Sequence, residues 1–206
     1  MSRSVALALD EAILGRRSVR RFLPRPVPPS LLRELVSLAA CAPAPHHSQP
    51  WRFVALSSRA REALGEAMGG AWRRDLLADG IAPAEVERLL SRSRRRLMAA
   101  PALLLACVDL SAARPWPDER RRRAERDMFV QSLGAALQNL MLAAHARGLG
   151  SCLLGAPLYC QEEVRAALGL PRDWEPAFLV EVGYPDPSYR PRDRETPALE
   201  GLLREV

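Results

Sequence analysis

Four neutral polar side chains follow one another in a proline-rich segment of this chain. His46, His47, Ser48 and Gln49 stand in the sequence A-P-A-P-H-H-S-Q-P-W (residues 42–51). Prolines stiffen a chain and lack a backbone donor, so Pro45 and its neighbours are suited to holding these side chains in fixed positions. The side chains offer donors and acceptors without a fixed charge, as a neutral heteroaromatic ligand would require. The alternative interpretation is a plain connector whose polar residues face water.

A second group with chemical potential is R-R-S-V-R, which holds Arg16, Arg17, Ser18 and Arg20. Three guanidiniums and a hydroxyl can bind a phosphate through charge-assisted and often bidentate hydrogen bonds. The chain contains 30 basic residues and every one is an arginine. An arginine cluster in such a chain is therefore weak support for a function when it is considered alone.

Two further segments could approach a ligand. The glycines of G-L-G-S-C-L-L-G (residues 148–155), which include Gly155 after Leu154, would let backbone amides come close to it. The segment lacks the G-x-G-x-x-G order of a dinucleotide site, and a tight turn from helix to strand is the alternative. Arg190 and Arg192 follow the last expected strand, where a solvated tail is the alternative.

Composition limits the classes of protein that fit. The 206 residues are enough for one domain, which we expect to span residues 1–206. We expect no membrane span and no secretory signal, and therefore a cytoplasmic location. The four cysteines lack metal-site spacing, so we expect no metal site. The net charge of +6 raises the question of nucleic acid, but the arginine runs at residues 92–96 and 120–126 lack interleaved aromatics, which favours solvated, salt-bridged faces.

Apolar periodicity predicts an α+β domain, in which helices flank a mixed sheet. The expected helices cover residues 5–14, 31–39, 59–77, 83–98 and 118–147, and the expected strands cover residues 51–56, 102–110, 149–154 and 177–182. Gly134 and the two alanines after it would allow close helix packing, either within the domain or across a dimer.

The four segments, in this order and spacing, resemble the nitroreductase family of flavin enzymes over about residues 11–195. More narrowly, A-P-A-P-H-H-S-Q-P, W-R-R-D-L-L-A-D-G (residues 72–80) and D-W-E-P (residues 173–176) are similar to the flavin-binding C-terminal domain of bifunctional coenzyme F-420 γ-glutamyl ligases. The chain resembles that domain standing alone, without the ligase domain.

The resemblance implies an intertwined homodimer with an FMN at each of two shared sites. Arg16, Arg17, Ser18 and Arg20 would hold the phosphate, ribityl chain and ring carbonyls, with Arg190 or Arg192 completing the phosphate site. From the other subunit, His47 and Gln49 would reach the flavin, together with Pro45, His46 and Ser48. Leu154 and Gly155 would lie beside the reactive nitrogen of the ring, although many family members carry an acidic residue where Leu154 stands.

The implied chemistry is carried by the flavin, and no side chain is expected to act as a nucleophile. Arg17 or Arg20 would stabilise the negative charge of the reduced ring. The leading hypothesis is FMN-dependent reduction of the dehydro precursor of coenzyme F-420, whose anionic tail Arg73 and Arg74 would contact, together with residues 92–96. A separate ligase subunit could dock on such a domain. The alternatives are a general NAD(P)H-dependent nitro or quinone reductase, and a flavin or deazaflavin binding protein without catalysis.

Overall fold

The fold is built around one antiparallel sheet. A computed structural model describes residues 8–193, 195 and 198–204. Its strands are β1 (Trp51–Ala55), β2 (Ala102–Asp109), β3 (Gly150–Leu154) and β4 (Trp174–Gly183), in the spatial order β1-β2-β4-β3. Every pair of neighbours in this sheet is antiparallel. β2 and β4 are the central strands, and β3 forms the edge at which the glycine-bearing segment lies.

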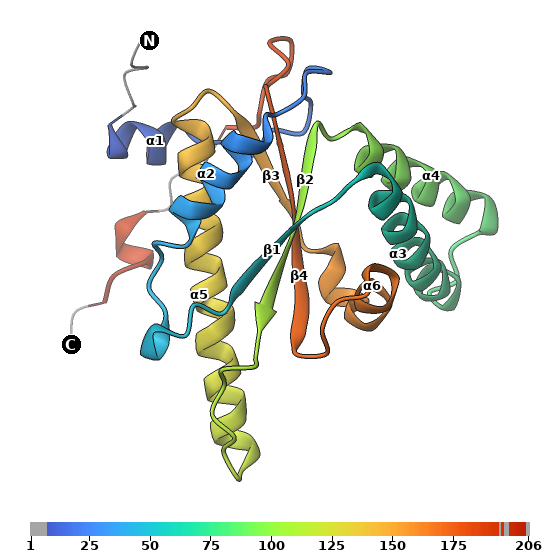
Figure 1. The fold of residues 1–206 in the computed structure, drawn as a ribbon. Helices are drawn as coiled ribbons and strands as arrows, with labels where there is room; N and C mark the ends of the chain where they lie inside the picture. The colour runs from blue at the N-terminus through green and yellow to red at the C-terminus, as the bar shows by residue number, and fades with distance from the viewer. Residues whose placement is uncertain (1–7, 194, 196–197, 205–206) are drawn as a thin grey trace.

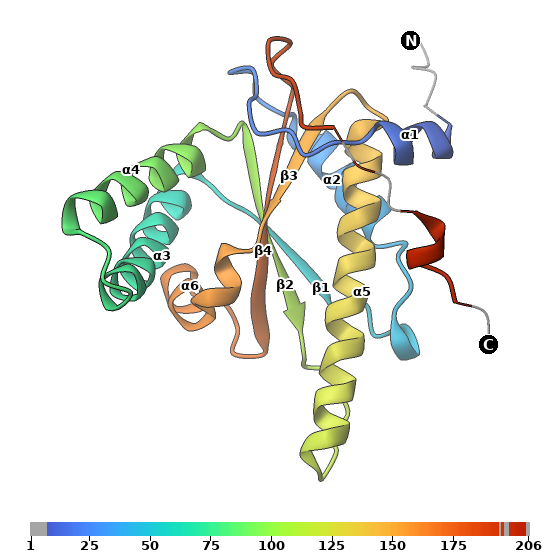
Figure 2. The same ribbon diagram turned by 180° about the vertical axis from the view of Figure 1, so that it is seen from behind.

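Helices cover both faces of the sheet (Figures 1 and 2). One face carries α1 (Leu9–Gly15), α2 (Pro29–Ala39) and the long helix α5 (Glu119–His145), and the other carries α3 (Ser58–Ala78), α4 (Pro83–Ala99) and α6 (Gln161–Leu168). Short 3-10 turns form η1 (Pro45–His47), η2 (Ala156–Tyr159) and η3 (Leu199–Gly201). No helix among the residues described is long and apolar enough to cross a membrane.

The two-sided cover explains the continuous apolar run of β2. Alternate side chains of a strand point to opposite faces of the sheet. Because helices cover both faces, all residues of β2 are buried. Leu104 packs with Phe129 and other residues of the α2–α5 side, whereas Leu105 packs with Leu64 of α3. The sheet is therefore the shared wall of two cores, and the loops at its ends are left to form sites.

The expected α+β class, the flanking helices and the four strands are confirmed. The mixed strand directions are not found within the four-stranded sheet, and the one parallel pairing among the described residues is an isolated bridge between Ser18 and Ser151. Helix α6 was not predicted, because its eight residues, Q-E-E-V-R-A-A-L, give little more than two turns of periodicity. Residues 5–7 of the first expected helix lie outside the described residues.

Candidate functional site

The segment of residues 16–20, which we call the arginine segment, is attached to the edge strand β3. The backbone N–H of Val19 donates to the carbonyl of Ser151 at 3.0 Å, and Ser18 forms a bridge with the same residue. Gly150 makes this approach feasible, since a Cβ on residue 150 would lie 2.7 Å from the Cβ of Val19. This glycine therefore admits another part of the chain, whereas the sequence interpretation assigned the close approach to a ligand.

A cavity of about 550 Å³ opens beside the arginine segment, and we call it the first cavity. Arg16, Arg17 and Arg190 line it together with the turn between α5 and β3. Arg17 is half-buried, and the backbone just before it holds its side chain. Its Nη1 donates to the carbonyls of Leu14 at 2.5 Å and Arg16 at 3.0 Å. The structure thus brings together cationic residues that are more than 170 positions apart in the sequence (190 − 16 = 174).

The other residues expected at the phosphate do not line the first cavity. Ser18 faces the bridge to β3, and the exposed Arg20 donates from Nη1 to the carbonyl of Ser18 at 3.4 Å. Arg192 is exposed and lies outside the lining, while Arg190 donates to the carbonyl of Pro187 at 2.8 Å. Arg190 is therefore the one of the two C-terminal candidates that shares a cavity with the arginine segment.

The first cavity has a positive field. His145, in the last turn of α5, lines it beside the arginines. Burial, together with the charges of Arg16 and Arg17, lowers the pKa of His145 below its ordinary value. Asp186 is the acidic residue of the lining, so cations outnumber anions there. A cavity with this balance attracts an anionic group.

The polar residues of the proline-rich segment lie in a strained turn at residues 45–49, which we call the His-Gln loop. His46, His47 and Gln49 have φ angles of 53°, 54° and 45°, in the left-handed region that costs a non-glycine residue about 1–2 kcal/mol. The Ser48 Oγ is buried and has no hydrogen-bond partner among the described residues. Strained backbone and an unsatisfied buried hydroxyl are features that cluster at ligand sites.

Arg52 fixes this loop to the sheet, a role that sequence reasoning missed. Its Nη1 donates to the carbonyls of Gln49 and Trp51, both at 2.8 Å, and its Nη2 lies 2.6 Å from Oδ2 of Asp109. Burial opposes ionisation of Asp109, but hydrogen bonds from Ser111 and the charge of Arg52 outweigh it and hold the pKa of this carboxyl below its ordinary value. The one available signal was an aspartate at the end of an otherwise apolar strand.

The His-Gln loop and the arginine segment do not meet within one chain. α1, which leads into the arginine segment, lies beside the C-terminal end of α5, whereas η1 lies further toward the N-terminal end of the same helix (Figures 1 and 2). The two segments therefore lie at different positions along α5.

Leu154 and Gly155 lie at the far end of β3, where they line a second cavity of about 1120 Å³ between α3 and α4. Arg73 lines the same cavity but forms a bidentate ion pair with Glu87. Arg74 lies outside the lining and is paired with Glu163 at 2.5 Å. Both proposed substrate-binding arginines thus join helices through ion pairs. Exposed Arg92 and Arg94 and half-buried Arg96 also line this cavity.

Arg96 has a structural partner that the sequence did not reveal. Its Nε and Nη2 donate to the two carboxylate oxygens of Glu181 at 2.8 and 2.6 Å, and Nη2 also lies 3.4 Å from the Sγ of Cys152. Glu181, on the central strand β4, is only 2% exposed. The arginine run at residues 92–96 is therefore partly a clamp on a buried carboxylate, beside the solvated face that was predicted.

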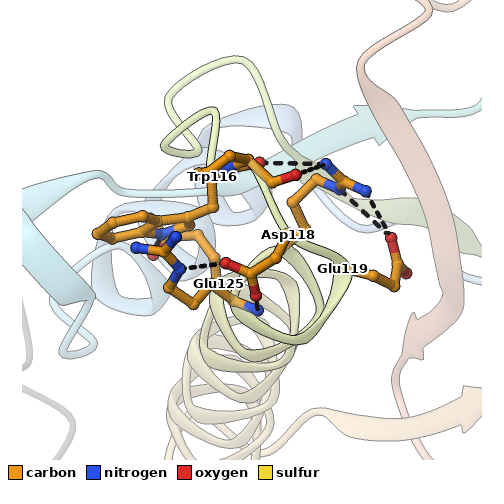
Figure 3. Close-up of polar contacts among 7 residues, drawn as sticks. Trp116, Asp118, Glu119 and Glu125 are labelled. Atoms are coloured by element: carbon orange, nitrogen blue, oxygen red, sulfur yellow. Dashed lines mark hydrogen bonds and ion pairs between the residues drawn. The ribbon is translucent and has the colours of Figure 1, made fainter.

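The start of α5 is fixed by polar contacts around Trp116 (Figure 3). The buried carboxylate of Glu125 accepts from the indole Nε1 at 3.2 Å. The arginines here form ion pairs with nearby carboxylates: Arg121 with Asp118, Arg122 with Glu119, and Arg126 with Glu175. For these three arginines the interpretation as a salt-bridged face is confirmed.

Comparison with curated proteins finds relatives that cover most of the chain. The NADH dehydrogenase of Thermus thermophilus is 33% identical over 84% of this chain and 85% of its own length. The chloronitrobenzene nitroreductase of Comamonas testosteroni is 28% identical over 87% of this chain and 88% of its own length.

Solved structures share the fold. The FMN-dependent nitroreductase NfnB from Mycobacterium smegmatis, solved in complex with NADPH, superposes with a TM-score of 0.67 at 25% identity, covering 96% of this chain and 97% of that one. A BluB-like flavoprotein from Clostridium difficile 630 has a TM-score of 0.80 at 22% identity, covering 97% and 99%, which shows the fold alone. The model of the nitroreductase family matches residues 13–184. This match spans most of the described fold, and the chain belongs to the nitroreductase family.

Proposed function

We propose that two copies of this chain bind FMN at two shared sites and that the protein catalyses NAD(P)H-dependent reduction of nitro or quinone compounds. The observation that carries the proposal is the first cavity, where Arg16, Arg17 and Arg190 converge beside β3. Family membership and relatives that are named as a nitroreductase and an NADH dehydrogenase support the same reaction class.

The residues present fit FMN. Arg16, Arg17 and Arg190 would hold the phosphate, because guanidiniums suit its charge and geometry. Ser18 and the exposed Arg20, in the same segment, would contact the ribityl chain and a ring carbonyl. Of this set Arg192 has the weakest structural support, because it lies outside the first cavity.

The His-Gln loop would come from the second copy. Its strained backbone presents the exposed His46, His47 and Gln49, and Ser48 would join them. Pro45 limits the freedom of the turn. A loop that is held in advance loses little entropy when it binds a ring, so the strain within it would be offset by binding.

When bound, FMN supplies the hydride chemistry. The protein then has to bind the FMN, orient it and polarise its ring. The guanidinium of Arg20 near a ring carbonyl would favour accumulation of negative charge there. Leu154 and Gly155, which line the second cavity, would form an apolar wall from which the backbone N–H of Gly155 can donate. An apolar Leu154 leaves that wall without a carboxylate.

The test uses purified protein and free FMN. We expect the protein to retain or take up one FMN per chain, with the visible bands of a bound flavin, and to oxidise NADH or NADPH when menadione or a nitroarene is the acceptor. A protein that binds FMN but is reduced by neither donor would be a flavin-binding protein without this activity. A protein that binds no FMN would contradict the proposal as a whole.

A second and narrower candidate is reduction of the dehydro precursor of coenzyme F-420, in which a separate ligase subunit would supply the substrate. The observation that favours it is the second cavity, whose lining includes exposed Arg92 and Arg94, and these guanidiniums would suit an anionic substrate tail. Protein carrying reduced FMN should then add two hydrogens to the precursor, which mass spectrometry detects. An unchanged precursor, together with turnover of menadione, would leave the general reductase and remove this candidate.

A further inference from the structure

His145 occupies an unusual position at the first cavity. It is half-buried in the last turn of α5 and lines the cavity beside the arginine segment. Its ring packs directly against Gly15, since a Cβ on that residue would lie 2.9 Å from the His145 Nε2. No hydrogen bond joins the ring to any group of the described part of the chain. The ring is thus held in place by packing while it remains available to a ligand.

The charges around the ring oppose its protonation when the cavity holds no anion. Arg16 and Arg17 face it from the segment that follows α1, and both lower its pKa in addition to burial. Arg190 faces the cavity from the segment after β4, where Asp186 and Tyr189 are the other ionisable residues of the lining. The C-terminus of α5 has the opposite effect and favours a cation.

The other ionisable groups of α5 and α1 near the ring are either paired or lie at the far end of their helix. The guanidinium of Arg147 is bound to Glu34 of α2, with Nε and Nη2 at 3.0 and 2.5 Å from Oε1. On α1 the acidic residues, Asp10 and Glu11, lie in the first turn, at the other end of the helix from Gly15. The protonation of His145 therefore depends chiefly on what occupies the first cavity.

We propose that His145 is a proton-coupled ligand of the phosphate group bound in the first cavity: the ring is neutral without an anion and takes up a proton when a phosphate dianion enters. A dianion within a few ångströms reverses the local field, and an opposite charge at 4–6 Å typically favours the charged form by about 1–3 pH units. The imidazolium then adds a fourth cation to Arg16, Arg17 and Arg190. Proton uptake on binding FMN rests on the proposed function, whereas proton uptake on binding inorganic phosphate does not.

The sign of the effect follows from linkage. Because the bound state holds more protons than the free state, phosphate affinity falls as the pH rises above the free-state pKa of His145. The phosphate itself also titrates near neutrality. Comparison of wild type with H145Q isolates the part that depends on the imidazole, because glutamine keeps a polar side chain that does not titrate.

The first experiment measures proton uptake by calorimetry at pH 7.5, in two buffers of different ionisation enthalpy. Wild type should take up as much as about one proton per FMN bound, and none with riboflavin, which lacks the phosphate. H145Q should take up none with FMN, and its FMN affinity at pH 6.5 should fall about tenfold. Equal proton uptake by wild type and H145Q would overturn the proposal.

The second experiment needs no variant to fold. In protein labelled with ¹³C-histidine, which contains three histidines, inorganic phosphate should move the His145 Cε1–H signal toward that of imidazolium. An unmoved signal at saturating phosphate would overturn the inference. If phosphate shifts His145 but FMN does not bind, the proposed function fails and the proton-coupled anion site stands. If FMN binds and His145 stays neutral, this inference fails and the proposed function stands.

Discussion

Gly150 and Val19 lie so close together that a methyl group on residue 150 would sit 2.7 Å from the Val19 Cβ. A backbone hydrogen bond of 3.0 Å from Val19 to Ser151 completes the contact. The arginine segment is therefore positioned by the backbone of β3, and its guanidiniums are left to serve the first cavity. The position of the arginine segment at the first cavity therefore depends on the absence of a side chain at Gly150.

Replacing Gly150 with alanine should displace the arginine segment. We expect a loss of about 1–3 kcal/mol in the free energy of unfolding, as for other overpacked sites, and at least a tenfold loss of FMN affinity. Urea denaturation and fluorescence titration measure the two effects. Gly69→Ala is the matched control, because nothing lies within 4 Å of a Cβ at that position. Normal FMN affinity in Gly150→Ala would show that the close contact does not position the site.

Replacing Arg52 with alanine should release the His-Gln loop. The carboxylate of Asp109, which is 5% exposed, would lose its ion-pair partner, and the carbonyl of Gln49 would lose a donor. We expect a destabilisation of about 3 kcal/mol and a faster dissociation of FMN. Arg88→Ala removes an exposed pair with Glu85 and should change the free energy of unfolding little. Similar effects of the two variants would contradict the role given to Arg52.

Asp109 should make stability depend on acid pH. Its pKa is lowered in the folded protein, so its ionised form stabilises the fold at pH values above the ordinary pKa of an aspartate, about 4, and this stabilisation is lost as the pH falls through the lowered value. Urea denaturation between pH 3 and pH 7 should therefore show a smaller pH dependence for Asp109→Asn than for wild type. If the free energy of unfolding depends equally on pH in the two proteins, Asp109 does not contribute to the pH dependence of stability.

The clamp between Arg96 and Glu181 gives a test of a buried ion pair. Arg96→Ala should destabilise the protein by about 3 kcal/mol, because it leaves the 2% exposed Glu181 without its partner. Replacing both residues together with methionine and leucine should recover most of this loss. Arg94→Ala, on the exposed side of α4, is the control and should have little effect. Thermal unfolding in one buffer compares all of these variants.

The sequence could predict the elements because apolar periodicity follows local geometry. The run at β2 and the amphipathic pattern of α5 give boundaries within two residues of those found. The arginine segment was recognisable by residue type. Its contact with β3 was not, since the close approach of Val19 to Gly150 joins two segments that meet only in the folded chain.

Partners of long-range ion pairs were equally hidden. Neither the Arg52 contact with Asp109 nor the Arg96 contact with Glu181 follows from spacing, because each joins residues that are more than 50 positions apart (109 − 52 = 57; 181 − 96 = 85). The left-handed conformation of His46, His47 and Gln49 also escaped prediction, since these residue types adopt it only when surrounding structure imposes it. Residue types could nominate the site, but only the fold could assign each residue a position in it.

Subunit complementation tests most directly the central claim, that each FMN is held by the arginine segment of one copy and the His-Gln loop of the other. One chain carries Arg16→Ala and Arg17→Ala, and a second, differently tagged chain carries His47→Ala and Gln49→Ala. Each variant alone should retain little FMN. A heterodimer purified through both tags should contain one intact site and bind one FMN per pair of chains. A heterodimer that binds no more FMN than the separate variants would place both segments at the same subunit's site, or at none, and would contradict the account.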